Sequence, residues 1–233
     1  MTGSAVVIGA SGGIGRAIAD ALDAEGSADP VYRFARSASA VADRIDLTDE
    51  RSIAAAAARV ATGARPTLVI VATGLLHEDG HGPEKAFADL DAAWLARQYA
   101  INAIGPALVA KHFLPLMPRG ERSVFAALSA RIGSIGDNRL GGWYGYRAAK
   151  AALNQLIRTL AIEERRRNDR SIVVGLHPGT VDTALSKPFQ ANVRPGTLFT
   201  PDRAAMQLLD VIDGLKMPDS GKLFDHEGVE IMP

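Results

Sequence analysis

Two side chains that can move a proton together, Tyr146 and Lys150, lie four residues apart in this chain. Their neighbours are good helix formers, in the run Gly145-Tyr146-Arg147-Ala148-Ala149-Lys150-Ala151-Ala152-Leu153. A spacing of i and i+4 on a helix places both side chains on one face. A free phenol has a pKa of about 10, and a nearby ammonium lowers it. The pair therefore predicts proton transfer by Tyr146, assisted by Lys150.

A glycine-rich turn near the N-terminus offers a place for a dinucleotide. Residues 4–9 are apolar and β-branched, which predicts a short buried strand, and residues 14–25 predict a helix with one apolar stripe. Glycines at such a junction let the backbone approach a pyrophosphate, which the helix N-terminus favours. The residues expected to bind the cofactor here are Gly9, Ser11, Gly12, Gly13, Ile14 and Gly15.

Apolar strand-like runs alternate with helical stretches along the chain, which predicts an α/β fold. Expected strands cover residues 5–8, 31–35, 68–72, 124–128, 172–176 and 222–224, and expected helices cover 14–25, 49–61, 89–115, 144–166 and 201–213. No linker divides the sequence, so residues 1–233 are expected to form one domain, a Rossmann-type doubly wound parallel sheet. The irregular segment 180–200 is either a substrate lid or an ordinary surface loop.

The glycine turn and the Tyr-x-x-x-Lys pair together resemble the short-chain dehydrogenase/reductases, over nearly the whole chain. Residues 129–147 and 220–225 are similar to the C-factor-like branch of that family. The resemblance implies reversible carbonyl–alcohol chemistry, with hydride passing between a nicotinamide and the substrate. It implies that Tyr146 and Lys150 act beside an active-site Asn102. It also implies cofactor contacts from Asp46, Leu47, Tyr146, Lys150 and the loop residues Pro178, Gly179, Val181 and Thr183.

Two positions depart from the family pattern. The family's Asn-x-Ala-Gly is replaced by Val71-Ala72-Thr73-Gly74, which keeps Gly74 for close passage of the cofactor. The family's usual serine position, about thirteen residues before the tyrosine, falls on Gly133. We favour Ser129 as the active-site serine because it ends an apolar strand. Ser134 is the alternative.

The end of the second predicted strand indicates the cofactor. An NAD enzyme places an acidic residue there to bind the ribose 2′-hydroxyl. This chain instead has Ala35, Arg36 and Ser37. An arginine pairs well with a phosphate, so Arg36 predicts NADP(H) over NAD(H).

Composition excludes several other classes. The 233 residues carry 26 basic and 26 acidic side chains, which argues against nucleic acid or an anionic membrane as a partner. The chain has no cysteine, no apolar run of membrane-spanning length and no basic leader, so a cytoplasmic protein is expected. His77, His81, His112 and His226 lack metal-ligand spacing, so no metal is expected.

The expected partner is a small carbonyl or alcohol, and a homo-oligomer is left open. Two further hypotheses come from other classes of function. One is an NADP-binding signalling or sensing protein without turnover, and the other is a structural subunit of an oligomer. Intact Tyr146, Lys150, Asn102 and a nearby serine favour the oxidoreductase.

Overall fold

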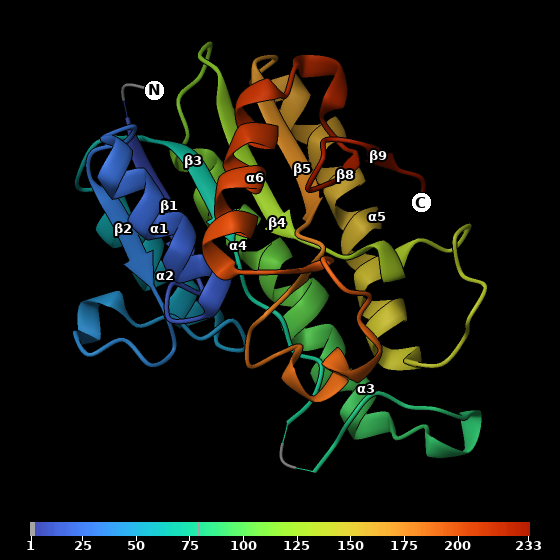
Figure 1. Ribbon diagram of the computed structural model, residues 1–233. Helices are drawn as coiled ribbons and strands as arrows, with labels where there is room; N and C mark the ends of the chain where they lie inside the picture. The colour runs from blue at the N-terminus through green and yellow to red at the C-terminus, as the bar shows by residue number, and fades with distance from the viewer. Residues whose placement is uncertain (1–2, 79) are drawn as a thin grey trace.

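The computed structural model describes residues 3–78 and 80–233. Its helices and loops surround one large sheet (Figure 1). Its strands are Ser4–Ile8 (β1), Val31–Phe34 (β2), Pro66–Val71 (β3), Ser123–Leu128 (β4), Ser171–His177 (β5), Leu223–Asp225 (β8) and Glu230–Ile231 (β9). The spatial order is β2-β1-β3-β4-β5-β8-β9, and only β8 and β9 pair antiparallel. The predicted parallel Rossmann-type sheet is confirmed, with β9 as an unpredicted antiparallel edge.

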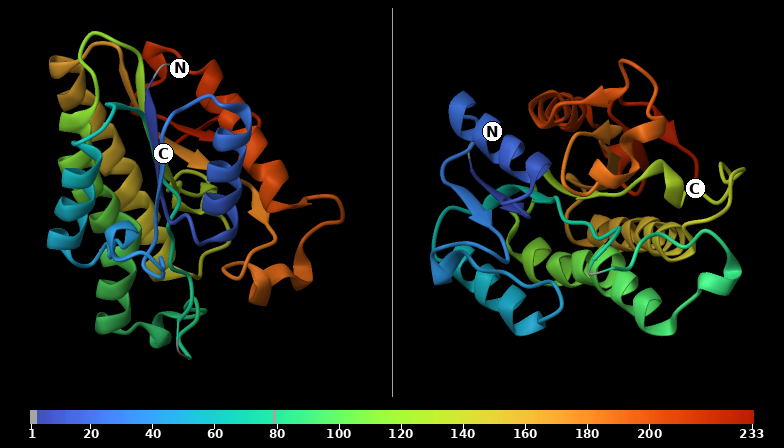
Figure 2. Two further views of the ribbon diagram at one scale, coloured as in Figure 1. Left: turned by 90° about the vertical axis from the view of Figure 1, so that its left-hand side faces the viewer. Right: turned by 60° about the horizontal axis from the view of Figure 1, so that its bottom comes forward.

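Helices cover both faces of the sheet (Figure 2). They are Gly13–Glu25 (α1), Glu50–Val60 (α2), Ala92–Tyr99 (α3), Gly105–Phe113 (α4), Tyr144–Arg167 (α5) and Pro201–Gly214 (α6). Short 3-10 turns cover Val41–Asp43, Phe87–Asp89, Leu114–Leu116, Arg131–Gly133, Lys187–Asn192 and Met217–Asp219. None of the helices in the described ranges is both long and apolar enough to cross a membrane.

Alternation along each strand divides the core into two layers. Ala5 and Val7 of β1 pack with α1 and α6, whereas Val6 and Ile8 pack with α2, α4 and α5. Both layers are almost fully buried, and this explains why the central strands are apolar on both faces.

The helix predicted over residues 89–115 is interrupted near its middle. A π-helical segment, Ala100–Ile104, separates α3 from α4. Pro106 has no N–H and cannot donate the helical bond to the carbonyl of Asn102, four residues earlier. The prediction of one unbroken helix is therefore wrong at Asn102, and such π segments are frequent at functional sites.

Strand order places the functional loops at one edge of the sheet. β1 pairs with β2 on one side and β3 on the other, so the chains leaving these strands diverge and open a crevice at their carboxyl ends. β3 lacks the family asparagine, yet the Ala72 N–H donates to the Ile8 carbonyl at 2.7 Å and joins the two strand ends.

The segment 180–200 lies below this same edge, where it forms the orange loop of Figure 1. It contains Thr180–Val181 (β6) and Leu198–Phe199 (β7), which pair with each other in parallel. Its role as a lid stays a prediction.

Candidate active site

Helix α5 carries three polar residues on one face at intervals of four, namely Tyr146, Lys150 and Asn154. Tyr146 is 8% exposed and Lys150 is 2% exposed. The Lys150 Nζ donates a hydrogen bond of 2.7 Å to the Leu128 carbonyl at the end of β4. The same Nζ lies 5.6 Å from the centre of the Tyr146 ring. The predicted pair is therefore brought together and tied to the sheet.

Burial controls the protonation of this pair. It raises the pKa of Tyr146 to about 12, and it lowers the pKa of Lys150 to about 7. Both shifts favour the uncharged form, because a charge loses hydration in this site. The net shift of the Tyr146 pKa is therefore opposite in direction to the lowering expected from the sequence.

The two candidate serines lie in different surroundings. Ser129 follows β4 and lines a cavity of about 190 Å³ with Gly13, Tyr146 and Lys150, which we call the tyrosine cavity. Its hydroxyl donates to the Asn154 Oδ1 at 2.6 Å. Ser134 is not among the residues lining this cavity, and its hydroxyl accepts a bond from the Asp137 N–H at 3.1 Å.

Asn102 is fully buried and lies outside the tyrosine cavity. Its Oδ1 accepts from the Leu75 N–H at 2.9 Å, and its Nδ2 donates to the Leu75 carbonyl at 2.8 Å. The Nδ2 also donates to the Gln98 Oε1 at 2.8 Å. The side chain thus holds the loop that follows Gly74.

Sequence reasoning missed two residues that support this site. Asn154 had a usable signal, because it lies four residues after Lys150. Glu84 had none. Its carboxylate is 3% exposed and accepts from the Gly145 N–H at 3.1 Å, which caps the first turn of α5 from 61 residues away.

The glycines of the turn are required by close packing of the protein's own atoms. Gly9 has a φ of +92°, which favours glycine, and a Cβ on Gly15 would lie 2.3 Å from the Gly9 carbonyl oxygen. A Cβ on Gly13 would lie 2.8 Å from the Thr183 methyl carbon. Gly15 thus serves packing, while Gly12, Gly13 and Ile14 line the tyrosine cavity.

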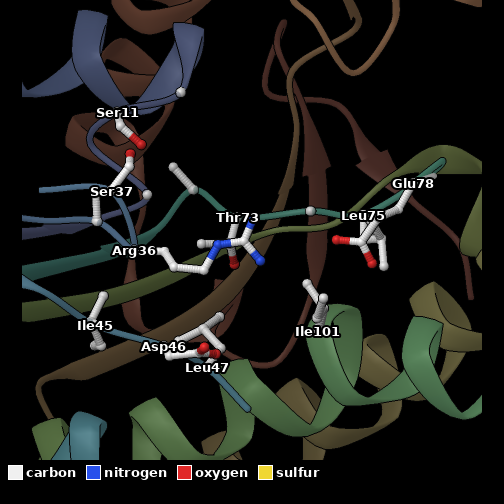
Figure 3. A pocket seen from close by; sticks show the side chains of 15 residues that line it. Ser11, Arg36, Ser37, Ile45, Asp46, Leu47, Thr73, Leu75, Glu78 and Ile101 are labelled. Atoms are coloured by element: carbon white, nitrogen blue, oxygen red, sulfur yellow. The ribbon is translucent and has the colours of Figure 1, made fainter. Parts of the chain in front are cut away.

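A second cavity of about 300 Å³ opens beside this turn, and we call it the arginine cavity (Figure 3). In Figure 3 the Arg36 side chain extends across it, and the hydroxyls of Ser11 and Ser37 point toward one another. The other predicted residues that line it are Gly9, Gly12, Asp46, Leu47 and Gly74. Hydroxyls, backbone N–H groups and one arginine around an open space fit a phosphorylated adenosine.

Two carboxylates also line the arginine cavity. Hydrogen bonds from the Thr48 N–H and hydroxyl hold the pKa of Asp46 below its ordinary value. Glu78, which was not predicted, forms a two-point ion pair with Arg97 at 3.0 and 3.2 Å, and these bonds lower its pKa. Arg97 thus offsets the charge of Glu78, whereas the bonds from Thr48 stabilise Asp46 as a carboxylate.

The loop after β5 closes the other side of the tyrosine cavity. Pro178 and Thr183 line it, and Gly179 has a φ of +73°. Gly179 and Val181 line an adjoining cavity of about 300 Å³ that also touches Ser129 and Tyr146. The predicted loop residues therefore lie around Tyr146.

A statistical model of the short chain dehydrogenase family matches residues 4–194. The chain belongs to the short-chain dehydrogenase family. The family's two sequence motifs, the glycine turn and the Tyr-x-x-x-Lys pair, lie together at one edge of the sheet.

Relatives within this family differ in what they do. The chain is 33% identical to 1-hydroxy-2-glutathionyl-2-methyl-3-butene dehydrogenase of Rhodococcus, over 96% of both chains. It is 38% identical to the C-signal protein of Myxococcus xanthus, over 63% of this chain and 82% of that protein. Its fold matches the NADPH-bound carbonyl reductase from chicken fatty liver with a TM-score of 0.83 and 25% identity, over 100% of this chain and 94% of that one.

Replacing the buried lysine should change how stability depends on pH. Because the folded-state pKa of Lys150 is lowered to about 7, the unfolded chain binds more protons between pH 7 and about 10.4. Wild-type stability therefore rises with pH across this window. Lys150→Met removes that dependence. The free energy of unfolding of Lys150→Met, relative to that of wild type, should therefore fall by roughly 3 kcal/mol from pH 7 to pH 9.5, at about 1.4 kcal/mol per pH unit.

Urea unfolding at the two pH values measures this difference. Lys216→Met, at an exposed lysine, is the matched control and should show little change with pH. A constant difference between Lys150→Met and wild type would mean that Lys150 keeps its ordinary pKa.

Proposed function

We propose that the protein is an NADP(H)-dependent oxidoreductase that moves a hydride between the nicotinamide and a carbonyl or alcohol substrate. The observation that carries the proposal is the shared cavity of Ser129, Tyr146 and Lys150, which adjoins the glycine turn. The chicken carbonyl reductase with bound NADPH supports the choice of reaction and cofactor.

NADP(H) would be held along the carboxyl edge of the sheet. Arg36, Ser11 and Ser37 would bind the phosphorylated ribose, Asp46 and Leu47 would contact the adenine, and the glycine turn would bind the pyrophosphate. Pro178, Gly179, Val181 and Thr183 would enclose the nicotinamide end. When bound, the nicotinamide supplies the hydride in reduction and accepts it in oxidation.

The protein's own residues would handle the oxygen of the substrate. Ser129 would turn its hydroxyl from Asn154 to the carbonyl oxygen, and the Tyr146 hydroxyl would deliver its proton to that oxygen as the hydride reaches the carbon. Burial raises the pKa of Tyr146 to about 12, so the phenol is protonated at neutral pH and carries the proton that reduction requires. Lys150 would bind the nicotinamide ribose, and Asn102 would serve the proton path through its backbone.

A second candidate function is suggested by the C-signal relative. An NADP-binding signalling protein would need the arginine cavity and the glycine turn, but it would not need a serine beside the tyrosine. Turnover therefore distinguishes the two functions.

Removing the phenol oxygen should abolish turnover. Tyr146→Phe keeps the ring that packs in the cavity and removes the proton donor. We expect no measurable NADPH oxidation with any carbonyl that wild type reduces, and a dissociation constant for NADPH within a few-fold of wild type. Tyr144→Phe, at a partly exposed position two residues earlier, is the control. Turnover of Tyr146→Phe within tenfold of wild type would rule out the assignment.

Reversing the charge at Arg36 should change the cofactor preference. Arg36→Asp removes a phosphate partner and adds a repelling carboxylate. A charge-assisted hydrogen bond contributes about 1.5–3 kcal/mol, so the dissociation constant for NADPH should rise about ten- to a hundredfold relative to that for NADH. Arg51→Asp, whose side chain is 98% exposed on α2, controls for net charge. An unchanged ratio of the two constants would show that Arg36 does not read the phosphate.

The two serines should differ when each is replaced. Loss of a preorganised donor to the reacting oxygen lowers kcat by roughly 10²–10³. We expect this loss for Ser129→Ala, which lines the tyrosine cavity, and a milder effect for Ser134→Ala, whose hydroxyl binds the Asp137 N–H. The reverse order in steady-state kinetics would transfer the role to Ser134.

A further inference from the structure

The cavity of about 300 Å³ that adjoins Ser129 and Tyr146 is lined mainly by apolar side chains, and we call it the aromatic cavity. Its polar lining residues besides Ser129 and Tyr146 are His177, Thr180, Thr183 and Ser186. Its large apolar side chains are Leu76, Ile132, Trp143, Leu185, Phe189 and Val193. A substrate with its carbonyl at Tyr146 would place the rest of its body among these side chains.

The lining of the aromatic cavity does not compensate a charge. Of the residues that the structure describes, no Asp, Glu, Lys or Arg lines it, and Lys150 lines the tyrosine cavity instead. His177 lies on its wall, where burial lowers its pKa to about 4 and keeps the ring neutral. An ionised substrate would lose hydration here without gaining an opposite charge.

Trp143 is fixed relative to the reacting tyrosine. It is the N-cap of α5, three residues before Tyr146, and its φ of +53° is rare for a bulky residue. Its N–H donates to the Glu84 carbonyl oxygen at 2.6 Å, while the Glu84 carboxylate holds the next turn. Such a conformation persists only where neighbouring groups enforce it, and it is common at ligand sites.

Phe189 faces Trp143 from the segment 180–200. The centres of the two rings lie 5.2 Å apart with an interplanar angle of 59°, and the Trp143 and Tyr146 rings lie 6.4 Å apart. These are the distances and tilts at which aromatic rings attract one another. Phe189 also contacts His77, at 5.7 Å between ring centres.

We propose that Trp143 and Phe189 form an aromatic clamp that selects an uncharged carbonyl substrate with an aryl or branched alkyl group. The assignment rests on the proposed function, because it takes Tyr146 as the group at the substrate oxygen. Trp143 forms the side of the cavity at the start of α5, and Phe189 forms the side that belongs to the segment 180–200.

The first experiment compares three ketones with NADPH as the reductant. Acetophenone carries the aryl group, benzoylformate adds a carboxylate to it, and 2-butanone lacks it. Wild type should show a kcat/KM at least tenfold higher for acetophenone than for the other two. Phe189→Ala and Trp143→Phe should lower this preference, Phe189→Ala by tenfold or more, with under threefold change for 2-butanone. Tyr144→Ala, an exposed aromatic on the same turn, should leave the preference unchanged.

A preference for benzoylformate, or an equal loss on acetophenone and 2-butanone in Phe189→Ala, would overturn the clamp. Phe189 has an ordinary φ, so its replacement adds no backbone strain of the kind present at Trp143.

A binding measurement separates this inference from the proposed function. Acetophenone is titrated calorimetrically into Tyr146→Phe with saturating NADPH, and into the double variant that also carries Phe189→Ala. Binding that weakens at least tenfold in the double variant supports the clamp, even if wild type turns over no carbonyl and the proposed function fails. Equal binding by both, or binding by neither, overturns the clamp.

Discussion

The bond from the Lys150 Nζ to the Leu128 carbonyl is the interaction on which the site depends. It joins α5 to the end of β4, so the residue one turn before the lysine and the residue after the leucine must face one another. These residues are Tyr146 and Ser129. Burying the lysine is unfavourable, as its lowered pKa indicates. The fold therefore buries an ionisable group, and the hydrogen bond of this group fixes the distance between β4 and α5.

The start of α5 is held by segments far away in the chain. Glu84 caps it, and Asn102 links the loop after Gly74 to Gln98 on α3. A Cβ on Gly145 would approach the Glu84 carboxylate at 2.8 Å and the Gln98 Cγ at 3.4 Å, so these side chains converge on the first turn of α5. The loop after Gly74 and the first turn of α5 thus each depend on a buried polar side chain from elsewhere in the chain.

Local pattern was enough to predict the sheet, the glycine turn and the face of α5, because each depends on neighbours within one turn or one strand. The π segment at Asn102 had a visible signal in Pro106, but the bond of the Asn102 side chain to Leu75, 27 residues away, did not. Glu84 could not be found, since its partner lies 61 residues on. The direction of the Tyr146 pKa shift was also out of reach, because burial depends on the whole packed core.

The protonation of the buried pair bears on the direction of the proposed reaction. With pKa values of about 12 for Tyr146 and about 7 for Lys150, the neutral pair is favoured over tyrosinate and ammonium. The site at rest therefore holds its proton on the phenol, which is the form needed to reduce a carbonyl. Oxidation would first require removal of that proton from a dry site. Because no Asp, Glu, Lys or Arg among the described residues lines the aromatic cavity, a tyrosinate would lose hydration there without gaining an opposite charge, as an ionised substrate would.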